Sequence, residues 1–139
     1  MNRVAILSAL IGLGIFSFAC ASKKIGTEKV IKSAPAGNNL TVALATNDGV
    51  LKHGDTEFTL KFTDASGNSV DVGAVALSFH MPPMGTMQSM SNGATFTTTE
   101  TPGLYHGKAN IEMAGEWQVQ ITYEGAAGRG KAAFSVNAQ

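Results

Sequence analysis

The stretch Trp117-Gln118-Val119-Gln120-Ile121-Thr122-Tyr123-Glu124 alternates apolar and polar residues without a break. Successive side chains of a β-strand point to opposite faces of the sheet. This period of two therefore predicts a strand with one face on a hydrophobic core and the other in water. The same alternation recurs in six other segments, which are 40–44, 58–62, 75–79, 94–99, 105–113 and 132–136.

Turn-forming residues separate these segments. Asn47-Asp48-Gly49 follows the first, Asp64-Ala65-Ser66-Gly67-Asn68 follows the second, and Thr101-Pro102-Gly103 precedes the segment that begins at Tyr105. Gly, Asn, Asp and Pro favour the backbone conformations of tight turns. About seven short strands with frequent turns are typical of an immunoglobulin-like antiparallel β-sandwich, so we predict an all-β domain of this class over residues 39–139.

Aromatic residues provide most of the predicted core. Burying one such ring stabilises a fold by roughly 1.5–3 kcal/mol, so a domain of this size can be stable without disulfides. The chain has a single cysteine and therefore no intrachain disulfide. The aromatic residues of the predicted core are Phe58, Phe62, Phe79, Phe96, Tyr105, Trp117, Tyr123 and Phe134.

Residues 1–21 have the pattern of a signal peptide. Arg3 forms a short basic region, and an apolar run over 4–19 follows it. This run is too short for a comfortable membrane span and lacks flanking stop-transfer charges. We therefore expect the protein to be exported from the cytoplasm.

Two processing routes compete at the end of this leader. Ala19-Cys20-Ala21 fits ordinary signal peptidase, whereas Cys20 is also placed to become the lipidated first residue of a bacterial lipoprotein. Ser17 and Phe18 depart from the usual lipidation signal. We favour lipidation because an exported lone cysteine otherwise leaves an unpaired thiol. The expected location is then the periplasmic side of a bacterial membrane, with the lipid on Cys20 as the anchor.

Residues 22–38 are polar and contain four lysines, and we predict that they form a flexible linker. These lysines suit either an anionic membrane surface or simple solubility. From residue 39 onwards five Lys and Arg face nine Asp and Glu. A mildly acidic domain without a basic face argues against nucleic acid as a partner.

Methionines gather in His80-Met81-Pro82-Pro83-Met84-Gly85-Thr86-Met87-Gln88-Ser89-Met90, where they recur at every third position. The two prolines favour polyproline II, which has three residues per turn, so the thioethers would line one side of an extended loop. Thioether sulfur is a soft, uncharged ligand that favours Cu(I). Strand parity also predicts that His80 and His106 point outwards, where they could meet a methionine of this loop. We therefore include both histidines among the predicted ligands. The predicted copper ligands are His80, Met81, Met84, Met87, Met90 and His106.

Two other interpretations of the methionines stay open. They can serve as flexible apolar residues that cover the open end of the sandwich, or as an apolar loop that binds a protein partner. Catalysis is not expected, because the chain has no nucleophile elbow, catalytic triad pattern, glycine-rich phosphate loop or H-E-x-x-H motif. We therefore expect a binding protein rather than an enzyme.

Three motifs resemble the YtkA-like (FixH/YtkA) domain family. They are Met81-Pro82-Pro83-Met84, Gly103-Leu104-Tyr105-His106-Gly107 and Met113-Ala114-Gly115-Glu116-Trp117. The resemblance covers roughly residues 39–137 and implies an immunoglobulin-like sandwich in an exported or membrane-tethered bacterial protein. It also implies a link to copper handling, cytochrome oxidase assembly or metal efflux. Many relatives carry His where this chain has Thr86.

The resulting hypothesis is an exported, lipid-anchored domain that holds Cu(I) for delivery to an oxidase-assembly or efflux partner. The alternative is a structural or adaptor module whose methionine loop docks on an envelope protein.

Overall fold

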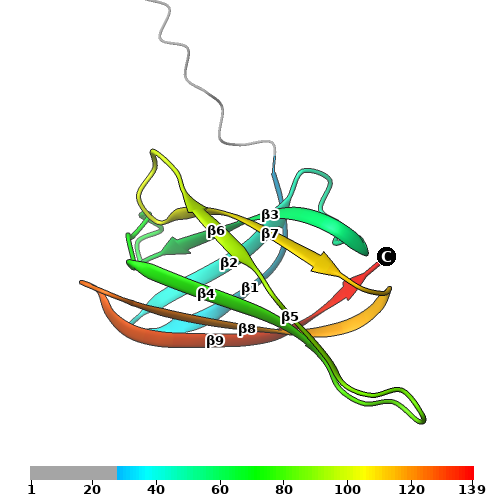
Figure 1. The fold of residues 1–139 in the computed structure, drawn as a ribbon. Coiled ribbons are helices and arrows are strands. Elements are labelled where there is room, and N and C mark those ends of the chain that lie inside the picture. The colour runs from blue at the N-terminus through cyan, green and yellow to red at the C-terminus, as the bar shows by residue number, and fades with distance from the viewer. Residues whose placement is uncertain (1–27) are drawn as a thin grey trace, which may run out of the picture.

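The computed structural model describes residues 28–139. Nine β-strands in this range form two antiparallel sheets that pack face to face (Figure 1). The first sheet has the order β1-β2-β3-β7-β6 and the second has the order β5-β4-β8-β9. The strands are β1 (Lys29–Gly37), β2 (Leu40–Thr46), β3 (Gly54–Thr63), β4 (Ala74–Met81), β5 (Met90–Gly93), β6 (Thr95–Thr98), β7 (Leu104–Ile111), β8 (Gly115–Gly125) and β9 (Gly128–Ala138). The prediction of an all-β sandwich is confirmed.

The core lies between the sheets and is centred on β8. Trp117, Val119 and Ile121 are completely buried, as the alternation of their segment predicts. Phe58 of the first sheet and Phe79 of the second meet edge to face, with ring centroids 5.8 Å apart and an interplanar angle of 84°. This geometry suits the ring quadrupoles and links the two sheets across the core.

Two buried tyrosines connect strands through their hydroxyl groups. The Tyr123 hydroxyl donates to the carbonyl oxygen of Ala36 at 2.9 Å, which ties β8 to β1. The Tyr105 hydroxyl accepts from the backbone N–H of Val72 at 3.3 Å and lies 3.1 Å from both Asp71 Oδ1 and the carbonyl oxygen of Gly73. Burial, followed by the contact with Asp71, raises the pKa of Tyr105 above its ordinary value. Tyr105 thus fixes the loop before β4 on β7.

The prediction of a flexible linker over 22–38 is wrong for residues 29–37, which form β1 and pair with β2. β1 is an edge strand, and its lysines and Pro35 are tolerated there because one side of the strand needs no hydrogen-bonded neighbour. Asn38 and Asn39 have φ angles of 52° and 58° and join β1 to β2 in a two-residue turn. Two positive φ angles are the signature of a type I′ hairpin turn.

The count of about seven strands is also too low, since β1 and β5 were not expected. All buried apolar residues of the core fall between Ala36 and Ala138. A chain that begins at residue 22 therefore contains everything that the core requires. Residues 28–139 contain no helix with the length and hydrophobicity that crossing a membrane requires.

The glycines of β7 and β5 provide a matched test of core packing. A Cβ at Gly107 would overlap the Phe58 ring and lie 2.9 Å from the Phe96 ring, whereas a Cβ at Gly93 would meet nothing within 4 Å. Overpacking costs typically about 1–3 kcal/mol, so we expect Gly107→Ala to lower the free energy of unfolding by about that amount. We expect Gly93→Ala to leave it unchanged or to raise it by less than about 1 kcal/mol. Urea denaturation of both variants checks this, and equal losses would contradict the packing described above.

Candidate metal site

The methionine segment is a β-hairpin that continues β4 and β5 beyond the sandwich (Figure 1). Met81 pairs with Met90 at its base, and Met84 pairs with Met87 at its tip. The tip pair exchanges two backbone hydrogen bonds, from Met84 N to Met87 O at 3.2 Å and from Met87 N to Met84 O at 2.9 Å. The predicted single row of thioethers along a polyproline-type loop is therefore wrong.

The turn at the tip contains two residues, Gly85 and Thr86. Gly85 has a φ of 58°, and Thr86 does not have a positive φ. A positive φ at the first central position alone matches a type II′ turn, which favours Gly there and suits the twist of a hairpin. The sequence around Gly85 thus favours a tight turn that holds the two flanking methionines opposite each other.

The hairpin divides the four methionines into two pairs. Directly opposed residues share a face of a β-ladder, whereas residues three positions apart along one strand lie on opposite faces. Met81 is only 2% exposed, while Met84 and Met87 are 56% and 42% exposed. Met90 is partly buried and packs against the core. The pair at the base of the hairpin, Met81 and Met90, therefore belongs to the core. The pair at its tip, Met84 and Met87, faces solvent.

Met81 is a structural residue of the second sheet. Its methyl group occupies the space above Gly115, since a Cβ at that glycine would lie 3.2 Å from Met81 Cε. Met81 also has the same parity as Leu77 and Phe79, which are both buried. The alternation of Leu77, Phe79 and Met81 in the sequence is the signal that predicts this buried position.

His80 lies on the outer face of β4, opposite Ser91 of β5 and Gln118 of β8. Met84 is four positions further along the chain, which corresponds to roughly 13 Å along a strand. His80 is partly buried rather than fully exposed. The structure therefore does not bring this imidazole to the methionine tip.

His106 lies in the other sheet, on β7, where it pairs with Thr59 and Thr97. Its Nδ1 atom lies 3.4 Å from Thr59 Oγ1, and that hydroxyl donates to Glu28 Oε1 at 2.7 Å. The two histidines thus lie on the outer faces of opposite sheets, and His106 cannot join His80 in one coordination sphere. His106 lines a hollow of about 190 Å³ together with Glu28, Thr46, Asn47, Glu57, Phe58 and Thr59.

Glu57, beside His106, already has a cationic partner. Its Oε1 atom lies 2.9 Å from Lys108 Nζ, and this contact lowers the pKa of the carboxyl group. In the part of the chain that the structure describes, no three His, Cys, Asp or Glu residues are grouped to hold a metal ion. Met84 and Met87 are the two exposed methionines, and the hairpin places them directly opposite each other.

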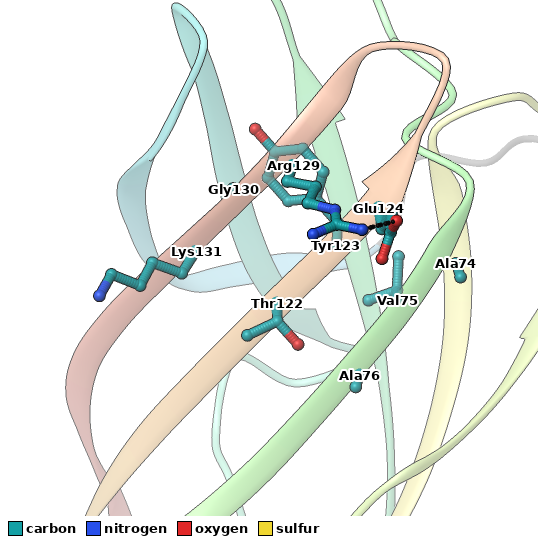
Figure 2. A pocket seen from close by; sticks show the side chains of 9 residues that line it. All are labelled: Ala74, Val75, Ala76, Thr122, Tyr123, Glu124, Arg129, Gly130 and Lys131. Carbon is teal, nitrogen blue, oxygen red and sulfur yellow. Dashed lines mark hydrogen bonds and ion pairs between the residues drawn. The ribbon is translucent and has the colours of Figure 1, made fainter.

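The outer face of the second sheet has a wider hollow of about 600 Å³ (Figure 2). Its floor is made by the small side chains of Ala74, Ala76 and Thr122. Arg129 and Glu124 also line this hollow and form an exposed ion pair, with Arg129 Nη2 2.6 Å from Glu124 Oε1 (dashed line in Figure 2). No residue of the methionine hairpin lines the hollow, so it is separate from the candidate metal ligands.

The remaining family motifs have structural roles. Gly103 has a φ of 80° and lies against the backbone of Val70, where any side chain would collide. Trp117 Nε1 donates to the carbonyl oxygen of Met113 at 3.0 Å, which closes the turn before β8. Met113 is partly buried and packs against the core, in agreement with its parity. Cys20, the predicted lipidation site, and the predicted signal peptide lie outside the described residues.

Stability measurements separate the core methionine from the tip methionine. Truncating a buried methionine typically costs about 2–5 kcal/mol, so we expect Met81→Ala to destabilise the domain by that amount. Met84→Ala removes an exposed side chain and should change the free energy of unfolding by less than about 0.5 kcal/mol. Thermal or urea unfolding of the two variants checks this difference. A Met81→Ala domain as stable as Met84→Ala would show that Met81 does not support the core.

The family model described as YtkA-like matches residues 35–122, which is more than half of the chain. No curated protein and no solved structure matches the chain. The matched range begins within β1, ends within β8 and includes the whole methionine hairpin. Domains of this family are generally exported. On this match, together with the sandwich and its three motifs, the chain belongs to the YtkA-like family.

Proposed function

We propose that this domain holds Cu(I) at the tip of its hairpin, through the thioethers of Met84 and Met87, and passes the ion to a partner. The observation that carries this proposal is the cross-strand pairing of two exposed methionines. Directly opposed residues in such a pair have Cα atoms about 5.5 Å apart, so both sulfurs can approach one ion. Soft, neutral thioethers favour Cu(I) over harder cations.

The surroundings of the tip suit exchange more than storage. Residues 72–99 include no Asp, Glu, Lys or Arg, so the hairpin itself supplies no charged side chain to offset the charge of the ion. The tip residues 82–89 are all exposed, which leaves the ion accessible to an acceptor. An acceptor with additional soft ligands would then withdraw the ion without unfolding the donor. We propose an oxidase-assembly or metal-efflux protein of the bacterial envelope as this acceptor.

The proposal reduces the ligand set that the sequence predicts. Met81 lies in the core, His80 lies back along β4, and His106 lies in the other sheet. The anchoring part of the proposal rests on the leader alone: export by residues 1–21 and a lipid on Cys20 would hold the domain at the periplasmic side of a membrane. The domain acts here as a carrier, without a catalytic role.

A second candidate function is that of an adaptor module. Met84 and Met87 are two of the three large hydrophobic side chains that are exposed among residues 28–139, and the hairpin around them is uncharged. Exposed apolar groups at a protruding tip suit a hydrophobic contact with an envelope protein. In that case shape and apolarity would matter, and sulfur would not.

Replacing both tip methionines with leucine distinguishes these functions. Leucine keeps the apolar volume but removes the sulfur ligand, so we expect Met84→Leu/Met87→Leu to weaken Cu(I) retention by more than about tenfold. The measurement is a titration against a chromogenic Cu(I) chelator near neutral pH, with a chain that begins at residue 22. This start removes the thiol of Cys20.

Met113→Leu is the matched control, because this methionine packs against the core. We expect it to retain Cu(I) as the unaltered domain does. Retention that survives the double replacement would reject the copper proposal. If a protein partner is captured equally by the double-leucine variant and lost on Met84→Glu/Met87→Glu, the adaptor function is supported instead.

A further inference from the structure

One hairpin tip offers only two soft ligands. The neighbouring positions on the same face of the hairpin, in the register of the two pairs, are Pro82 and Ser89, and neither carries sulfur or imidazole. Gly85 and Thr86 complete the turn with backbone groups and one hydroxyl, which are hard ligands. Since His80 is roughly 13 Å away along the strand, a Cu(I) ion at the tip is left open on the side that faces solvent.

The tip is accessible to a second set of ligands, because the hairpin projects and carries no charged side chain. The hairpin projects from the end of the sandwich, so another molecule can reach the tip without contact between the two domain bodies (Figure 1). The range 72–99, which has no Asp, Glu, Lys or Arg, covers the whole hairpin and both strands that it continues, β4 and β5. Two such hairpins can therefore meet tip to tip without like-charge repulsion between their own side chains.

We infer that the tip is one half of a Cu(I) site and that a second copy of the chain supplies the other half. This inference rests on the proposed function of Met84 and Met87. A two-fold axis through the ion brings the two thioethers of one tip together with the same two of the other, as in an isologous dimer. The ion stays Cu(I), four neutral sulfurs replace its solvent ligands, and no bond within the protein is broken.

This arrangement makes copper binding depend on protein concentration. A site within one chain binds copper with a constant affinity, whereas a shared site follows mass action in the second copy. We expect the chain from residue 22 to take up half an equivalent of Cu(I) and to double its mass in anaerobic sedimentation. In competition with a chelator, the apparent affinity should fall about tenfold for each tenfold dilution of the protein.

Variants separate this inference from the proposed function itself. Met84→Leu/Met87→Leu should remain monomeric at every copper concentration, and Met113→Leu should dimerise like the unaltered chain. One equivalent of copper on a monomer, with an affinity that does not change on dilution, would overturn the shared site and leave the proposed function standing. Dimerisation without copper would also overturn it. Absence of any Cu(I) uptake would reject both.

Discussion

The two-residue period of the β-strand is the constraint on which the rest of this structure depends. In β8 it turns Trp117, Val119 and Ile121 towards the core and their polar neighbours towards solvent. The same period continues along β4 and into the hairpin, which extends beyond the core. Because of this period Met81 points into the core and Met84 points towards solvent, although both are methionines and lie only three positions apart.

Much of the fold was predictable because alternation is a local signal. The strand around Trp117 and the aromatic core follow from it directly. β1 was not predicted, since an edge strand needs only one hydrogen-bonded neighbour and tolerates Lys29, Lys32 and Pro35. The turn at Asn38 and Asn39 was the signal that could have found it.

The candidate site was less predictable, because it depends on which strands share a sheet. His80 and His106 both point outwards, as strand parity predicts, but they belong to different sheets and so to opposite sides of the sandwich. The alternation within a strand does not indicate to which sheet the strand belongs. The grouping of Met84 with Met87 instead follows from the short turn at Gly85, which the prediction of an extended polyproline-type loop leaves out.

The family motifs divide between scaffold and tip. Tyr105 and Gly103 hold the loop before β4, and Trp117 closes the turn before β8. Met81 packs over Gly115 and so joins one motif to another. Of the two methionines in the loop motif, Met81 is buried and Met84 is exposed. Because the hairpin is anchored at its base and exposed at its tip, substitutions at the tip can leave the core unaltered.

The separation of buried and exposed methionines has a consequence for oxidative damage. Thioethers are converted to sulfoxides most readily where oxidants can reach them, and the sulfoxide is polar and no longer a soft ligand. Met84 and Met87 would react first, while Met81 is shielded by the sheet around it. Because methionine sulfoxide is reducible by repair enzymes, such damage at the tip would be reversible and would leave the core of the domain intact.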